Sequence, residues 1–251
     1  MIDKLFYVKM DKIIEKIDAC RKEPEFTDEL NLRNSKIPDF SISSRDLFKK
    51  MATLICFSQN ARSDAVQRMV DTDNFSMIFS GFDIELVSAM DLEEIKDKYW
   101  DILKPIRFKG KIDSILNCAK IMNSGSINMQ EMLKSVPVLL KSYEDIDQFW
   151  KSFCNIRTQL EQNNMPFFKS ITSLLHLLLY LGYDCLKPDQ IVMNVSINEL
   201  HLVASQKNKD KIYVVKAIQQ YCVDRKIRPA VVDFYLLVEG GQTWANQFKK
   251  C

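Results

Sequence analysis

The most apolar stretch of this 251-residue chain lies at residues 171–181, with the sequence ITSLLHLLLYL. Its polar positions are Thr172, Ser173, His176 and Tyr180. A membrane-spanning helix needs about 20 apolar residues, so an 11-residue run is too short to cross a bilayer. A helix that is apolar on nearly every face is stable only when other helices surround it. Residues 171–181 are therefore predicted to form the central helix of a helical core.

Boundary signals flank this predicted helix. Gly182 directly follows the run, and glycine commonly ends helices because it adopts the left-handed conformation without strain. Pro188 keeps the preceding residue out of the helical conformation, so the chain is expected to approach the next helix in an extended form. Asp189 then stands where an N-cap belongs, just before the apolar residues of a second helix.

The composition favours an all-α protein. Hydrophobic residues make up 47% of the chain, whereas there are only 6 glycines and 7 prolines, which suits a compact helical fold. No alternating apolar and polar run lies between hairpin turns, as a β-strand would require. The formal net charge is only +2, so any affinity for nucleic acid must come from a local basic patch.

Cysteine and histidine usage argues against metals, cofactors and disulfides. The seven cysteines are scattered without a CxxC pair, which is typical of reduced thiols in an intracellular protein. This pattern excludes a clustered four-cysteine iron–sulfur site, and two histidines are too few for a zinc site. The charged N-terminus has the pattern of neither a signal peptide nor a membrane anchor. We therefore expect no metal, no cofactor and no membrane association.

The rest of the chain is predicted to be mostly helical. Residues 1–20 have the apolar spacing of an amphipathic helix, and residues 21–43, with two prolines, are predicted to be a loop. We expect residues 1–43 to pack on a helical domain formed by residues 44–251, arranged as two interleaved lobes. Within that domain, a charged loop is predicted at 208–211, and helices are predicted at 45–56, 64–70, 115–121, 129–133, 212–223 and 230–238, with another beginning at Asp91.

Two local basic clusters are candidates for contact with a polyanion. The first comprises Arg107, Lys109 and Lys111 at the start of a predicted helix, and the second includes Arg225. Such clusters also occur at the solvated ends of helices, and the residues alone leave both interpretations open. If these side chains bind DNA phosphates, affinity must fall steeply with added salt, because each neutralised phosphate releases counterions.

Aromatic residues precede the apolar run. Trp150 and Phe153 lie in the sequence FWKSF, at a spacing that usually indicates packing between helices. The same residue types can hold an extruded base between flat apolar surfaces. Together with His176 and Tyr180 of the apolar run, Trp150 and Phe153 are therefore the candidate residues of a base pocket.

Several of these motifs resemble the helix-hairpin-helix DNA glycosylase superfamily, also called HhH-GPD. The resemblance runs from Met165–Pro166 through the apolar helix to Pro188–Asp189. The sequence Ser58–Gln59–Asn60 after an apolar helix is a second point of resemblance. The segment at 106–112 is similar to a helix of bacterial 3-methyladenine DNA glycosylase I, and the overall pattern is also similar to endonuclease III-like folds. The resemblance covers most of residues 45–240.

The resemblance implies an all-α, bilobal helical HhH-GPD fold and a function in base excision repair. It implies that Asp189 is the carboxylate that stabilises the cation-like sugar while water hydrolyses the N-glycosidic bond of a flipped base. It also implies that the hairpin binds DNA phosphates through Lys169 and Ser170, and that Gln59 and Asn60 face the DNA. The implied partner is double-stranded DNA with a damaged base, and the implied state is an intracellular monomer.

This chain departs from the family pattern at two places. Phe167, Phe168 and Lys169 stand where the family hairpin has Gly-x-Gly, and glycines allow a phosphate to approach the backbone closely. Ile171 stands where strand-cutting members carry a lysine, so the resemblance implies a monofunctional enzyme without lyase activity. The missing glycines also fit an alternative, in which the fold has lost catalysis and binds DNA or a protein partner.

Overall fold

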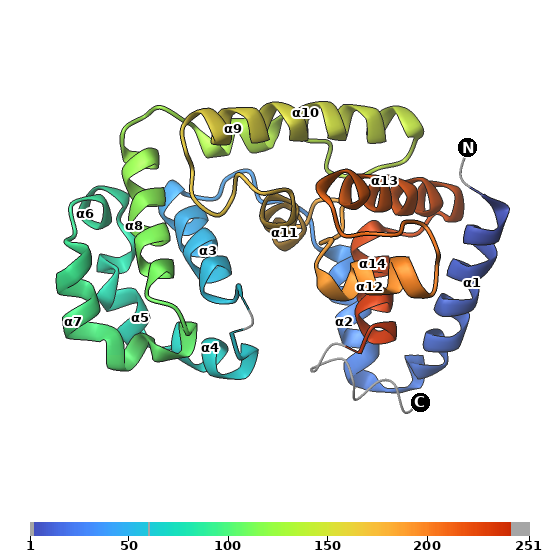
Figure 1. The fold of residues 1–251 in the computed structure, drawn as a ribbon, viewed down its shortest axis with the longest axis horizontal. Helices are drawn as coiled ribbons and strands as arrows, with labels where there is room; N and C mark the ends of the chain where they lie inside the picture. The colour runs from blue at the N-terminus through green and yellow to red at the C-terminus, as the bar shows by residue number, and fades with distance from the viewer. Residues whose placement is uncertain (1–2, 60, 242–251) are drawn as a thin grey trace. The chain divides into compact units, whose positions relative to one another are not determined.

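The computed structural model of the chain describes residues 3–59 and 61–241, and these ranges contain only helices and loops (Figure 1). The predicted all-α class is therefore confirmed. The α-helices are α1 (Lys4–Asp18), α2 (Pro24–Ser35), α3 (Ser44–Cys56), α4 (Ser63–Val70), α5 (Asp73–Ile78), α6 (Ile84–Ser88), α7 (Leu92–Leu103), α8 (Gly110–Asn123), α9 (Met129–Lys134), α10 (Tyr143–Gln162), α11 (Ile171–Leu181), α12 (Gln190–Asn198), α13 (Asn208–Arg225) and α14 (Pro229–Glu239). Short 3-10 helices are η1 (Ala19–Lys22), η2 (Ser80–Phe82) and η3 (Lys104–Ile106).

The chain divides into two compact units. Unit 1 contains residues 1–38, 136–154 and 170–251, and unit 2 contains residues 39–135 and 155–169. The helices α1, α2 and α11 to α14 therefore belong to unit 1, whereas α3 to α9 belong to unit 2. The long helix α10 begins in unit 1 and ends in unit 2. Unit 1 is thus assembled from three separate segments of the chain.

Aromatic packing holds the core of unit 2 together. The ring centroids of Phe75, Phe79 and Phe82 lie 5.2 to 5.9 Å apart, and Phe48 of α3 packs edge-on against Phe82. The helix α3 begins after Ser43, whose hydroxyl accepts a hydrogen bond from a backbone N–H of the first turn at 3.0 Å. The local cap and the buried aromatic rings together fix α3 in this core.

The helix α11 belongs to unit 1, and its bounds are those of the apolar run. The hydroxyl of Ser170 caps its first turn by accepting a hydrogen bond from the Ser173 N–H at 3.2 Å. It packs on α13, and four of its leucines are fully buried: Leu174, Leu175, Leu177 and Leu178. The predicted helix at residues 171–181 is therefore confirmed with its buried leucine face, but the predicted central position is wrong, because α14 is the helix that packs against α1, α2, α12 and α13.

Gly182 ends α11, as predicted, and the position requires glycine for two reasons. Its φ of 104° lies in the left-handed region that side chains rarely adopt. A Cβ at this position would also lie 2.9 Å from the carbonyl carbon of Ile37. The chain between α11 and α12 can therefore leave the helix only because residue 182 carries no side chain.

The region from 21 to 43 is not the predicted loop, because α2 occupies part of it. Pro24 stands in the first turn of α2, where a missing N–H costs nothing since that group has no partner within a helix. Phe26 and Leu30 lie one turn apart and are buried, and α2 packs against α14. The predicted loop at 208–211 is likewise wrong, because those residues form the first turn of α13.

Polar contacts join α1 to the C-terminal helices within unit 1, where α1 packs against α14. Asp11 accepts a hydrogen bond from the Tyr221 hydroxyl at 2.7 Å and forms an ion pair with Arg225 at 2.7 Å. Tyr7 donates to Asp224 at 2.6 Å. The N-terminal segment is therefore an integral part of unit 1 through polar contacts as well as apolar ones.

Candidate functional site

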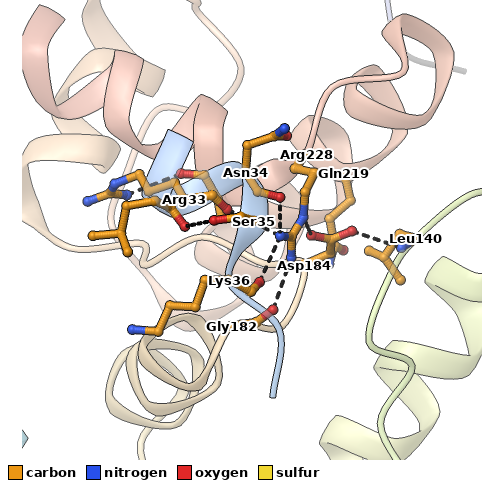
Figure 2. A network of polar contacts seen from close by, with 11 residues as sticks. Arg33, Asn34, Ser35, Lys36, Leu140, Gly182, Asp184, Gln219 and Arg228 are labelled. Carbon is orange, nitrogen blue, oxygen red and sulfur yellow. Dashed lines mark hydrogen bonds and ion pairs between the residues drawn. The ribbon is translucent and has the colours of Figure 1, made fainter. Parts of the chain in front are cut away.

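The connection between α11 and α12, residues 182–189, carries the candidate carboxylate Asp189. Arg228 forms hydrogen bonds with the first residues of this connection (Figure 2). The Arg228 guanidinium donates to Asp184 Oδ1 at 2.7 Å and to the Gly182 carbonyl at 3.0 Å. It also donates to three carbonyls at the end of α2, those of Arg33, Asn34 and Lys36. One buried cation at the start of α14 therefore holds two distant parts of unit 1 together.

Asp184 is held from its other sides as well. Its Oδ2 accepts a hydrogen bond from the Leu140 N–H at 3.0 Å, and its carbonyl accepts one from the Gln219 side chain at 3.1 Å. Burial raises the pKa of Asp184, while the Leu140 N–H and the Arg228 guanidinium oppose that rise. Both carboxylate oxygens have donors, so Asp184 is committed to holding the connection in place.

Side chains from two other helices, α14 and α11, contact the backbone of residues 187 and 188. The Lys187 N–H donates to Asp233 of α14 at 3.0 Å. The Thr172 hydroxyl of α11 lies 3.4 Å from the Pro188 carbonyl, and the Lys211 ammonium of α13 lies 3.0 Å from that hydroxyl. The backbone that leads to α12 is therefore positioned by polar contacts on both sides.

Asp189 itself caps α12, as predicted. Its Oδ1 accepts hydrogen bonds from the N–H groups of Ile191 and Val192 at 3.0 and 3.1 Å. Its Oδ2 lies 3.3 Å from the Lys187 ammonium, and 22% of the side chain is exposed. A partly exposed carboxylate that is fixed through Oδ1 can present negative charge to a bound molecule once the Lys187 ammonium leaves Oδ2.

Buried charges surround this carboxylate. Asp233 forms an ion pair with Arg33 at 2.9 Å. Burial raises the pKa of Asp233, the Arg33 guanidinium opposes the rise, and the nearby charge of Asp189 adds to it. Burial also lowers the pKa of His176 well below its usual value, and the positive Lys187 and Arg33 lower it further. His176 is therefore a neutral imidazole at physiological pH.

The four candidate residues of the base pocket fall into two groups. Trp150 and Phe153 lie in the core of unit 1, where the Trp150 indole donates to Gln219 at 2.7 Å. His176 and Tyr180 lie one turn apart on a partly exposed face of α11, with the Lys36 ammonium 4.7 Å from the Tyr180 ring centroid. The structure therefore gives Trp150 and Phe153 a packing role and leaves His176 and Tyr180 on the face that Thr172 shares.

In unit 2, Lys111 joins the end of α3 to the start of α8. Its ammonium donates to the carbonyls of Cys56 and Ser58 at 2.9 and 2.6 Å. The residue is only 3% exposed, and burial lowers its pKa to about 8. Lys111 therefore satisfies carbonyls at a helix end here, which differs from the predicted contact with phosphate.

Further candidates of unit 2 lie in two loops, one that follows α3 and one that precedes α8. Gln59 and Arg107 both have positive φ, at 52° and 73°, and Asn60 lies outside the described residues. The Arg107 guanidinium lies 5.1 Å from the ring centroid of Phe108, which is 44% exposed. The Lys109 ammonium lies 5.3 Å from the ring centroid of Trp100. Cations and aromatic rings therefore occur together in the segment before α8.

The hairpin before α11 adopts its turn without glycine. Phe167 has a φ of 63°, a conformation that is uncommon for a bulky residue and normally favours glycine. Phe168 is fully buried, and its N–H donates to the Pro166 carbonyl at 2.6 Å. Lys169 and the capping residue Ser170 are exposed, and the Lys169 carbonyl accepts a hydrogen bond from Arg157. The turn before α11 thus contains a left-handed residue that is not glycine.

The remaining basic candidate, Arg225, belongs to the contacts that hold α1. Its guanidinium pairs with Asp11 and lies 5.4 Å from the Tyr7 ring centroid and 5.6 Å from that of Tyr221. These contacts lower the pKa of Asp11, chiefly through the hydrogen bond from Arg225. Arg225 and Asp189 are both in unit 1. The Arg225 guanidinium, however, is paired with Asp11 of α1.

Sequence reasoning missed the residues that hold Asp189 in place, chiefly Lys187, Asp233 and Arg228. One signal was present, because Asp233 interrupts the apolar sequence AVVDFYLLV of α14. A carboxylate in such a helix is almost always paired, since an isolated buried charge is very costly. That signal predicts a buried cation, but it does not identify Arg33 as the partner.

Within residues 3–59 and 61–241, no group of three or more histidine, cysteine or acidic side chains is arranged to hold a metal ion. None of the helices described in those ranges is long and apolar enough to cross a membrane. The six cysteines that the structure describes form no disulfide bonds, and five of them are buried.

Comparison of the chain with protein-family models, with curated proteins and with solved structures found no match in any of the three. Function is therefore inferred from the residues and their geometry.

Proposed function

We propose that this chain is a monofunctional DNA glycosylase of the helix-hairpin-helix type. In this proposal it binds double-stranded DNA as a monomer, flips a damaged base out of the duplex and hydrolyses the N-glycosidic bond with Asp189. The support comes from the resemblance carried by Met165–Pro166 and Pro188–Asp189 together with the geometry around Asp189.

The single observation that carries the proposal is how firmly the chain before Asp189 is positioned. An N-cap needs only the hydrogen bonds from its carboxylate to the first turn of its helix. Here the Lys187 N–H also donates to Asp233, and the Thr172 hydroxyl, which accepts from Lys211, donates to the Pro188 carbonyl. Such additional support is what a catalytic group requires, because its position must be fixed to within about 0.5 Å.

The chemistry needs one carboxylate and no nucleophilic amine. Breaking an N-glycosidic bond develops positive charge on the sugar, which a nearby carboxylate stabilises while it orients the attacking water. In this proposal Asp189 uses Oδ2, because its Oδ1 is occupied by the N–H groups at the start of α12, and the Lys187 ammonium must leave Oδ2 first. Ile171 occupies the position of the lysine in strand-cutting relatives, so we expect base excision without strand cleavage.

The alternative is a protein of this fold that binds DNA or a protein partner without cutting. The hairpin favours it, because Phe167 and Phe168 replace the glycines that admit a phosphate. The ion pair between Lys187 and Asp189 favours it as well, because it engages the second carboxylate oxygen.

A panel of duplexes with alkylated, oxidised or deaminated bases distinguishes the glycosylase from the alternative that binds without cutting. Single-turnover excision on the preferred lesion should fall at least about 100-fold in Asp189→Asn. With the enzyme in saturating excess, so that a lost phosphate contact does not limit the rate, excision should stay unchanged in Lys169→Ala, and borohydride should trap no covalent complex. The near-isosteric asparagine keeps the cap, so an unchanged melting temperature isolates catalysis from stability. DNA binding without excision of any lesion would support the alternative, and full activity of Asp189→Asn would overturn the assignment of the carboxylate.

A further inference from the structure

Lys187 stands two residues before the candidate catalytic carboxylate and contacts it directly. The distance between its ammonium nitrogen and Asp189 Oδ2 is 3.3 Å. Because Asp189 Oδ1 is already occupied by the first turn of α12, both carboxylate oxygens are engaged in the DNA-free protein. A carboxylate in this state offers less negative charge to a developing sugar cation than one whose Oδ2 is free.

The two ends of this ion pair differ in mobility. Asp189 is fixed by its hydrogen bonds to α12, and the Lys187 backbone is fixed by its hydrogen bond to Asp233. The Lys187 side chain is a flexible stem, 31% exposed, with a compact ammonium at its tip. The ammonium can therefore leave Asp189 by rotation of the side chain alone, without movement of the helices.

Exchanging Asp189 for another anion should cost the Lys187 ammonium little free energy. Partly exposed ion pairs between lysine and a carboxylate are weak, because water competes for both charges. A DNA phosphate is an alternative anion for the same ammonium, and its neutralisation releases condensed counterions. The exchange also leaves Asp189 with its hydrogen bonds to Ile191 and Val192 intact, so the carboxylate keeps its position.

We infer that Lys187 is a substrate-released latch on Asp189. In the free protein its ammonium holds Asp189 Oδ2, and in the complex a phosphate of the bound DNA takes the ammonium and frees that oxygen for the sugar. This inference rests on the proposed function, because it assumes that DNA is the substrate. It makes Lys187 a positioning residue that couples the availability of the carboxylate to the presence of the phosphodiester backbone.

A double-mutant cycle on DNA binding tests the latch without requiring excision. The four proteins are wild type, Asp189→Asn, Lys187→Gln and the double variant, titrated with a short duplex that carries a stable abasic-site analogue. Removing the Asp189 charge frees the ammonium for phosphate, so Asp189→Asn should tighten binding about fivefold when Lys187 is present. In the Lys187→Gln background the tightening should shrink to about twofold or less, since only general charge repulsion is relieved.

Salt dependence supplies the second measurement, with Lys209→Gln as the matched control. Lys209 is an exposed lysine of α13 in the same unit. Lys187→Gln should reduce the slope of log affinity against log salt by about one, because one phosphate contact is lost. The tightening caused by Asp189→Asn should persist in the Lys209→Gln background, where the latch is intact.

The outcomes separate the latch from the proposed function. Equal tightening by Asp189→Asn with and without Lys187, or an unchanged salt slope in Lys187→Gln, would overturn the latch while the glycosylase proposal stands. A wild-type protein that binds no duplex at low salt would overturn both. The expected pattern, a coupled pair and a reduced slope, would hold even if the chain binds DNA without cutting it.

Discussion

Asp184 and Asp189 lie in the same short connection, yet their surroundings differ in kind. The side chain of Asp184 is 3% exposed, and Arg228 pairs with it at 2.7 Å. The side chain of Asp189 is 22% exposed, and Lys187 pairs with it at 3.3 Å. A buried pair whose every oxygen has a donor holds the fold in place, whereas a partly exposed pair can exchange partners. Position in the sequence therefore says little about which carboxylate is available for chemistry.

Lys111 and Lys187 repeat the contrast. Lys111 is buried, and its ammonium is occupied by the carbonyls of Cys56 and Ser58. Lys187 is partly exposed, and its flexible side chain can turn toward solvent. A lysine can thus be structural or exchangeable, and burial decides between the two roles.

The largest expected effect is the loss of Arg228. Arg228→Met leaves Asp184 buried without its cation, so we expect the free energy of unfolding to fall by about 3 to 5 kcal/mol. Urea unfolding at neutral pH measures the loss. Arg225→Met, which breaks the more exposed pair with Asp11, is the matched control and should cost much less. Equal losses in the two variants would remove the distinction between the buried pair and the exposed one.

The buried lysine should give a smaller, pH-dependent effect. Burial lowers the pKa of Lys111 from 10.5 to about 8, so between these values the unfolded chain binds a proton that the folded chain does not. Stability should therefore rise with pH across this interval, by about 1 to 3 kcal/mol more in the wild type than in Lys111→Met. Urea unfolding at successive pH values measures this difference. A difference between the two proteins that stays constant with pH would contradict the lowered pKa.

Removing the carboxylate cap tests Asp189 as a structural residue. Asp189→Ala deletes the hydrogen bonds to the first turn of α12 and should lower stability by about 1 kcal/mol. Asp189→Asn keeps an acceptor at the same place and should change the melting temperature much less. Thermal unfolding of the two variants side by side gives the comparison. If asparagine is as damaging as alanine, loss of excision in Asp189→Asn no longer isolates charge from stability.

The smallest expected effect belongs to Lys187. Its partly exposed pair with Asp189 should contribute no more than about 0.5 kcal/mol, so Lys187→Gln should unfold almost like wild type. Chemical denaturation with Lys209→Gln as reference resolves a difference of this size. A loss comparable with that of Arg228→Met would mean that Lys187 is a structural residue and that the contrast between the two ends of the connection is wrong.

Features decided within a few residues were predictable from the sequence. The bounds of α11 follow from its apolar run, its end from Gly182, and the cap of α12 from the Pro188–Asp189 pair. The helix α2 was missed because its charged sequence and Pro24 resemble a loop, and its helical state depends on burying Phe26 against α14. Local sequence signals identify a helix only when its formation does not depend on tertiary packing.

The contacts that position Asp189 were not predictable for the same reason. Arg228 binds carbonyls that lie 192 to 195 residues earlier in the chain, and Asp233 pairs with Arg33 across 200 residues. Lys111 was assigned to a surface patch because its sequence neighbours are basic, although its ammonium is buried on the end of α3. Spacing within a motif cannot reveal partners that only the fold brings together.

The hydrogen bonds from Arg228 to the end of α2 also set an order for folding during synthesis. The chain emerges from the ribosome N-terminus first, so α1 and α2 appear long before their partners in α13 and α14. Unit 2 ends at residue 169 and can complete its contacts while the C-terminal helices are still being made. The carbonyls of Arg33, Asn34 and Lys36 at the end of α2 must stay solvated until Arg228 is available. We therefore expect nascent chains stalled before this arginine to expose a protease-sensitive N-terminal segment beside an already protected unit 2.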